Sequence, residues 1–262
     1  MNELHLQDKF LIPFFCNDLG YSEVKANTVT NSLIIEEDLE FFISETDLNK
    51  KAYDTLLKKY KGDKNLLLKE LIELIQERIG SSRNMALFIN ANKSITLQGV
   101  KLHLFYPSDS VIHGNKLFEQ NIFSVIQELP YKFKFQGEQI FSFRPDIVLF
   151  VNGIYLGYIE LKSNYTSQNA SKNGRGKVIK DYFEAVKAYH QHIDSNDMLS
   201  ENEKLALRKD FLKIFEKAIH ITTTDIGETY VIRTIADYFD EILTTCREGK
   251  FDREEIEKKA HS

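Results

Sequence analysis

RPDIVLFVNGIYLGYIELKS, residues 144–163, is the stretch of the chain that decides its fold. Apolar residues dominate 143–151 and 154–163, and the dipeptide Asn152-Gly153 separates these two runs. Asn-Gly between apolar runs is the strongest short-range signal for a β-hairpin, because both residues tolerate a positive φ. We therefore predict two adjacent antiparallel strands joined by a tight turn.

The residues with chemical potential lie at the ends of these two strands. Asp146 opens the first strand, whereas Glu160 and Lys162 end the second. Side chains two positions apart share one face of a strand, so Glu160 and Lys162 point together while Ile159 and Leu161 point into the core. Carboxylate oxygens suit Mg²⁺, and a nearby lysine can activate water and offset charge on a phosphate. The combination indicates phosphodiester hydrolysis, although a weak surface ion pair would leave the same pattern.

The turn sets a condition on this site. A strict two-residue turn would place Asp146 on the sheet face opposite Glu160. We therefore expect either a three-residue loop, 151–153, or a β-bulge close to Pro145.

Length and composition bound the class of protein. The chain has 262 residues, of which 42% are hydrophobic, enough for one sizeable core or a core with a satellite. Cys16 and Cys246 form no zinc or disulfide pattern, so we expect a reducing cytoplasm. We expect no association with a membrane, because no apolar run approaches the roughly 20 residues that a membrane span needs. A net charge of −5 excludes a uniformly basic surface for nucleic acid.

One segment is more basic than the rest of the chain. Between Lys162 and Lys187 there are six basic residues against two acids, a local excess of four positive charges. A solvated loop and helix face is the ordinary explanation of such a run. Next to the strand ends, however, the segment is a candidate strip for DNA phosphates. The expected DNA contacts are Lys172, Arg175, Lys177, Lys180 and Tyr182.

Apolar spacing predicts a helical hairpin before the strands. Its first helix opens at 46–47 and ends before Gly62, and its second is capped by Asp63 or Asn65 and ends at Gly80. The first 45 residues allow no firm assignment. Elsewhere we predict strands at 85–89, 100–106, 131–135, 218–223 and 229–232, and helices at about 115–129, 178–193, 203–217 and 235–243.

This order of elements favours a mixed α/β (α+β) fold, a small mixed sheet flanked by helices. We predict a largely helical N-terminal extension at 1–98, a core at 99–235 and a C-terminal helical segment at 236–262. No internal repeat is present in the sequence.

At 144–163 the sequence resembles the nuclease motif of the R subunit of type I restriction-modification enzymes. In that motif a PD, a strand-turn-strand hairpin and an E-L-K recur in this order. The stretches NKKAYDTLLKKY, GNKLFEQNIFSVIQEL and RGKVIKDYFEAVKAY are similar to flanking parts of the same amino-terminal domain. The resemblance implies a restriction-endonuclease-like core and a Mg²⁺-dependent DNA endonuclease of the PD-(D/E)xK type.

The same resemblance assigns roles to individual residues. It implies that Asp146 and Glu160 are metal ligands, that the Leu161 carbonyl is a further ligand, and that Lys162 is the catalytic lysine. We expect these residues to lie at a water-facing strand edge, with packing left to neighbours such as Ile147.

On the following helix the chain departs from the family pattern. Many members carry a glutamine four residues before a tyrosine, and here Val178 precedes Tyr182 at that spacing. Lys177 or Lys180 could then take over a role toward DNA.

The resemblance also implies partners. These are double-stranded DNA, methylation and specificity subunits, and an ATP-driven translocase. A G-x-x-x-x-G-K-[ST] phosphate loop is missing from the 262 residues, so ATP would act only through a domain outside them. A DNA-repair or junction nuclease of the same fold, and a degenerate domain that binds DNA or a partner, remain as alternatives.

Overall fold

The computed structural model describes residues 3–79, 93–108, 116–162, 174–216, 219–224, 229–232 and 238–249. Packing divides the chain into two compact units. Unit 1 comprises Met1–Leu11, Gln127–Ile147 and Gly157–Ser262, and unit 2 comprises Ile12–Ile126 and Val148–Leu156. The division at 1–98, 99–235 and 236–262 stays a prediction.

Unit 2 contains the predicted helical hairpin. Its helices are α3 (Lys50–Lys59) and α4 (Lys64–Arg78), and the chain between them passes through Gly62 at φ 84°. Asp63 caps α4, because its side chain accepts a hydrogen bond from the Leu66 backbone N–H at 2.9 Å. The predicted end of this helix at Gly80 lies outside the described residues. The other elements of this unit are η2 (Phe14–Asp18), β1 (Ser22–Glu23), η3 (Ala26–Thr28), α2 (Glu36–Glu45), β2 (Ser94–Leu97), β3 (Val100–His103), η5 (Phe118–Gln120) and β4 (Phe123–Gln127).

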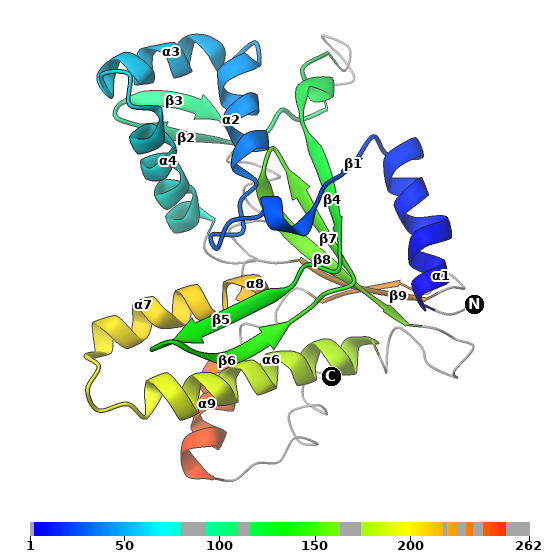
Figure 1. The fold of residues 1–262 in the computed structure, drawn as a ribbon, viewed down its shortest axis with the longest axis vertical. Helices are drawn as coiled ribbons and strands as arrows, with labels where there is room; N and C mark the ends of the chain where they lie inside the picture. Colours follow the sequence, from blue (N-terminus) through cyan, green and yellow to red (C-terminus); the bar gives the residue numbers. More distant parts are fainter. Residues whose placement is uncertain are drawn as a thin grey trace. The chain divides into compact units, whose positions relative to one another are not determined.

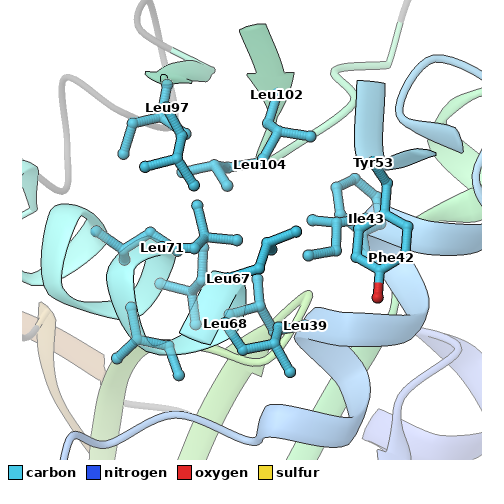
Figure 2. Packing of buried hydrophobic residues seen from close by; sticks show 14 of the residues in the cluster. Leu39, Phe42, Ile43, Tyr53, Leu67, Leu68, Leu71, Leu97, Leu102 and Leu104 are labelled. Carbon is cyan, nitrogen blue, oxygen red and sulfur yellow. The ribbon is translucent and has the colours of Figure 1, made fainter. Parts of the chain in front are cut away.

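The core of unit 2 is mainly aliphatic, with a few aromatic side chains such as Phe42 and Tyr106. Figure 2 shows leucines of α2 and α4 packed toward the leucines of the β2–β3 hairpin and its exit. Leu39, Leu67, Leu71 and Leu102 are all fully buried. This burial stabilises the unit without any charged group, at roughly 1.5–3 kcal/mol for each large side chain.

One predicted helix of this unit is wrong. Apolar spacing predicted a helix at about 115–129, but the chain forms only the short η5 and then strand β4. The Asn121 side chain donates to Tyr106 O (2.7 Å) and accepts from Tyr106 N (3.0 Å), so it ties the chain in an extended path where a helix would have continued. The predicted strand at 85–89 lies outside the described residues.

The β-hairpin at Asn152-Gly153 forms between β7 (Ile147–Val151) and β8 (Ile154–Lys162). Asn152 and Gly153 have φ values of 50° and 76°, so the turn has two residues with positive φ, and the predicted three-residue loop is wrong. Asn152 is fully buried, and its amide binds Leu104 O at 2.9 Å and the Ile122 backbone N–H at 2.7 Å. These bonds hold the tight turn in place.

Unit 1 contains the end of β8 and the strands and helices around it. Strand β8 pairs in parallel with β9 (Ile219–Thr224). Strands β9 and β10 (Thr229–Ile232), predicted at 218–223 and 229–232, pair antiparallel. The full strand order is β1-β4-β7-β8-β9-β10, a mixed sheet. The other elements are α1 (Glu3–Leu6), η1 (Gln7–Leu11), β5 (Tyr131–Phe135), β6 (Glu138–Phe143), α6 (Arg175–Tyr189), η8 (His190–Asp194), α7 (Glu201–Phe211), α8 (Lys213–Glu216) and α9 (Phe239–Glu248).

Three predicted elements of unit 1 need correction. The strand predicted at 143–151 is broken, because β6 ends at Phe143 and β7 begins only at Ile147, with Pro145 between them unable to donate to a strand ladder. The helix predicted at 203–217 is interrupted at Leu212. The last helix extends beyond the predicted 243 to Glu248.

Aromatic packing fixes the layer beneath β8. The β5–β6 hairpin lies along α6 (Figure 1). Tyr158 of β8 packs edge-on against Phe143 at 5.2 Å and against His220 of β9 at 4.8 Å between ring centroids. Burial lowers the pKa of His220 to about 4, so the ring is neutral and belongs to this apolar layer. The β8 face that carries Tyr158 is therefore covered by other parts of the unit.

The contact between β8 and β9 allows a direct test at Gly157. A Cβ at Gly157 would lie 2.1 Å from the Ile219 backbone oxygen, so the two strands must separate to admit alanine. We expect Gly157→Ala to lower the free energy of unfolding by more than about 2 kcal/mol. At Gly176 of α6 a Cβ meets nothing within 4 Å, so Gly176→Ala should instead stabilise the helix by up to about 1 kcal/mol. Urea unfolding of both variants checks this pair, and equal effects of the same sign would contradict the strand contact.

Candidate active site

The end of β8 presents Glu160 and Lys162 on one side of the strand. Their partners on β9 are Thr222 and Thr224 in parallel register. Glu160 is 1% exposed and Lys162 is 8% exposed, so the predicted water-facing strand edge is wrong. The reason is that the Tyr158 face of β8, which both residues share, is covered.

Asp146 lies in the bend between β6 and β7, before the pleat of β7 begins. Its Oδ2 accepts a hydrogen bond from the Leu161 backbone N–H at 2.7 Å. Its own carbonyl accepts from the Glu128 backbone N–H at 2.9 Å and from Gln7 Nε2 at 3.1 Å. Because a bend residue is not bound to strand alternation, Asp146 reaches the end of β8 despite the two-residue turn. The predicted bulge near Pro145 is thus replaced by a bend.

Two ammonium groups meet one oxygen of Glu160. Lys162 Nζ donates to Glu160 Oε1 at 2.8 Å and to Leu161 O at 2.7 Å, and Lys177 Nζ of α6 also contacts Glu160 Oε1. Glu3 Oε1 lies 3.9 Å from Lys162 Nζ. The other carboxylate oxygen, Glu160 Oε2, is buried and has no hydrogen-bond partner within the described part of the chain.

Two acids of this cluster, Asp146 and Asp181, have raised pKa values. Burial, followed by the charge of Glu160, raises the pKa of Asp146 to about 6. Burial also raises the pKa of Asp181, on α6, to about 6, and Glu160 adds to this. Burial lowers the pKa of Lys177, but the neighbouring carboxylates outweigh it and the net shift is upward. Burial, more than charge repulsion, therefore disfavours the ionised forms of Asp146 and Asp181.

Oxygen donors dominate the set that could hold a metal. The predicted ligands are Asp146, Glu160 and the Leu161 carbonyl, and the Lys162 ammonium already contacts oxygens of the last two. Carboxylate and carbonyl oxygens match Mg²⁺ better than softer metals, and the unpaired Glu160 Oε2 is an available donor. Among the described residues no group of three or more His, Cys, Asp or Glu side chains could hold a metal.

The structure separates the residues predicted to bind DNA. Lys172 lies outside the described residues, and Arg175 begins α6. Lys177 is directed at Glu160, whereas Lys180 is exposed. Tyr182 is fully buried with its ring 5.5 Å from that of Phe215, so it is a core residue without a surface for DNA. Val178 is buried as well.

Sequence reasoning missed Asp181 and Gln7, and it did not predict the contact of Lys177 with Glu160. Lys177 and Asp181 are four residues apart, beside the buried stripe of α6, and this spacing was a usable signal. Gln7 is 139 residues from Asp146, and nothing in its surroundings predicts the contact.

A comparison with protein families identifies the family of the chain. A family model described as the type I restriction enzyme R protein N terminus matches residues 1–226. The chain belongs to this family. The resemblance seen at 144–163 is thereby confirmed, and membership of the R-protein N-terminal family associates the chain with a nuclease role. No curated protein and no solved structure matches the chain. In the described part of this R-protein N-terminal domain, no helix is long and apolar enough to cross a membrane.

The raised pKa of Asp146 predicts how stability depends on pH. Its folded pKa of about 6 lies above its ordinary 3.8, so the ionised side chain costs stability above pH 6, and this cost disappears as the pH falls toward 4. Asp146→Asn keeps an oxygen for the Leu161 N–H. We expect it to raise the free energy of unfolding near pH 7.5 by about 1–2 kcal/mol, after allowance for partial exposure. Urea unfolding in chelator should show this gain shrinking between pH 6 and pH 4.

Asp54→Asn, at an exposed position of α3, is the matched control. Its effect on the free energy of unfolding should be small at pH 7.5 and at pH 4. An Asp146→Asn gain that grows as the pH falls would contradict the assigned direction of the pKa shift.

Proposed function

We propose that this chain is the Mg²⁺-dependent DNA endonuclease domain of a type I restriction enzyme R subunit, with its active site at Asp146, Glu160 and Lys162. The observation that carries the proposal is the unpaired, buried Oε2 of Glu160 beside the Asp146 carboxylate. A charged oxygen is seldom left unpaired in a protein interior, because its desolvation is costly. A bound cation would satisfy it.

In this proposal Asp146, Glu160 and the Leu161 carbonyl hold the metal. Bound Mg²⁺ would supply Lewis-acid activation of water and of the phosphate. Lys162 donates to Glu160 Oε1 and Leu161 O, so it orients two of these oxygens. Its ammonium group can also stabilise negative charge that develops on the phosphate, and burial strengthens that interaction.

The family match favours a role in restriction over one in DNA repair. Double-stranded DNA would be the substrate, and methylation and specificity subunits would choose the site. An ATP-driven translocase outside these residues would deliver the DNA. The convergence of all three residues in one cluster favours an active enzyme over a degenerate binding domain.

Neutral variants of similar shape test the site. Alanine at Glu160 would leave two ammonium groups near the strand without their shared partner, so a loss of activity could reflect misfolding. We expect Asp146→Asn, Glu160→Gln and Lys162→Met each to lower plasmid cleavage by the assembled restriction enzyme about 100-fold or more. Translocation-coupled ATP hydrolysis should be retained, because the site has no contact with nucleotide in this proposal.

The exposed ion pair of Glu45 and Lys50 provides controls with the same chemical changes. Glu45→Gln and Lys50→Met should cleave at the parental rate. Parental cleavage by any one of the three site variants would remove the role assigned to that residue.

The 262-residue chain alone should bind DNA weakly. Its net charge is −5, Lys177 is engaged by Glu160, and few cations remain in the described part of the basic segment to meet phosphates. We expect a dissociation constant above about 1 μM at physiological salt, with affinity that falls as salt rises and no preference over scrambled sequence. Fluorescence anisotropy with a short duplex measures this. Nanomolar, sequence-selective binding would instead indicate a self-sufficient restriction nuclease.

A further inference from the structure

Helix α6 brings a second lysine into the candidate site. Lys177 lies in the first turn of α6, and its Nζ contacts Glu160 Oε1, the oxygen that also accepts from Lys162. The helix is held in place by buried Val178, Tyr182 and Val186, so the position of Lys177 follows from packing.

The two lysines differ in their access to solvent. The Lys162 side chain is 10% exposed, whereas that of Lys177 is 38% exposed, although both reach the same buried oxygen. Lys162 has a second acceptor in the Leu161 carbonyl. The Lys162 ammonium is therefore enclosed by its acceptors. The Lys177 side chain is the more accessible of the two to solvent, and hence to an anion.

The charges around Glu160 also distinguish the two lysines. One carboxylate receives two ammonium groups through a single oxygen, so either ammonium can leave without exposing an unpaired charge on Glu160. A lysine on a flexible four-carbon stem that is partly in solvent leaves at the lower cost. A divalent cation at Glu160 Oε2 would repel both ammonium groups at Oε1, and Lys177 would be the first to leave.

We propose that Lys177 is a second positioning lysine of this site, which neutralises Glu160 when no metal is bound and turns to the DNA phosphate when a divalent cation binds Glu160. The inference rests on the proposed function. A lysine that only contacted phosphate would leave the metal affinity of the site unchanged. Lys177, by contrast, is expected to weaken metal binding and yet to support cleavage. It also gives the lysines different positions in the site: Lys162 stays on the ligand oxygens, and Lys177 supplies a second ammonium group for the phosphate.

The test compares cation affinity with cleavage in the full chain. Mn²⁺ is the probe, because it generally binds oxygen-rich sites at least as tightly as Mg²⁺, and isothermal titration calorimetry measures it. Lys177→Gln removes the competing charge, so Mn²⁺ should bind about fivefold tighter or more. Plasmid cleavage by the assembled enzyme should nevertheless fall by roughly tenfold or more. Lys177→Arg keeps the charge and should bind Mn²⁺ close to the parental affinity.

Lys209→Gln, which makes the same change at an exposed position of α7, is the control and should match the parent in both measurements. Circular dichroism and thermal unfolding confirm that each variant is folded. Unchanged or weaker Mn²⁺ binding by folded Lys177→Gln would overturn the inference, even if DNA binding were reduced.

The parent and Glu160→Gln distinguish a failure of the inference from a failure of the proposed function. If the parent binds Mn²⁺ and Glu160→Gln does not, the site is a metal site. The Lys177→Gln result then tests only the inference about Lys177. If the parent does not bind Mn²⁺, or Glu160→Gln binds it equally well, the proposed function is wrong and the inference falls with it.

Discussion

The hydrogen bond from the Leu161 backbone N–H to Asp146 Oδ2 is the interaction on which the site depends. It joins a residue in an irregular bend to the end of a regular strand, and it brings two carboxylates together across the tight turn of the hairpin. Gln7 and Glu128 fix the Asp146 backbone from the other side. Without the bend, strand alternation would have turned the Asp146 side chain away from Glu160.

Burying the carboxyl groups of Asp146 and Glu160 next to each other lowers the stability of the folded chain. Burial and mutual repulsion raise the pKa of Asp146, and two ammonium groups offset the charge of Glu160. Ion pairs of this kind seldom stabilise a fold more than apolar residues of the same size would. The apolar core of unit 2 and the aromatic layer beneath β8 supply the stability that the site does not. Such a division between stable packing and strained charge is typical of functional sites.

The sequence was informative where structure is local. Asn152-Gly153 predicted the hairpin, helical spacing predicted α3 and α4, and alternation placed Glu160 and Lys162 on one face. It was misleading at 115–129, where apolar residues fit a helix but the buried amide of Asn121 favours an extended chain. The burial of Glu160 and the contacts of Lys177 and Gln7 depend on segments that return from elsewhere in the chain, and spacing along one strand contains no information about them.

The charges of the site indicate how an acidic domain could act on DNA under the proposed function. In the metal-free chain the carboxylates of Asp146, Asp181 and Glu160 oppose the approach of phosphate, and the cations nearest to them are already paired with Glu160. Under the proposed function, a bound divalent cation reverses this local potential and releases an ammonium group toward the substrate. Affinity for DNA then depends on the metal and on partners that hold the DNA, rather than on the surface of the domain itself. Under the proposed function, a domain whose DNA affinity depends on metal and partners would seldom cut DNA that it meets by diffusion alone.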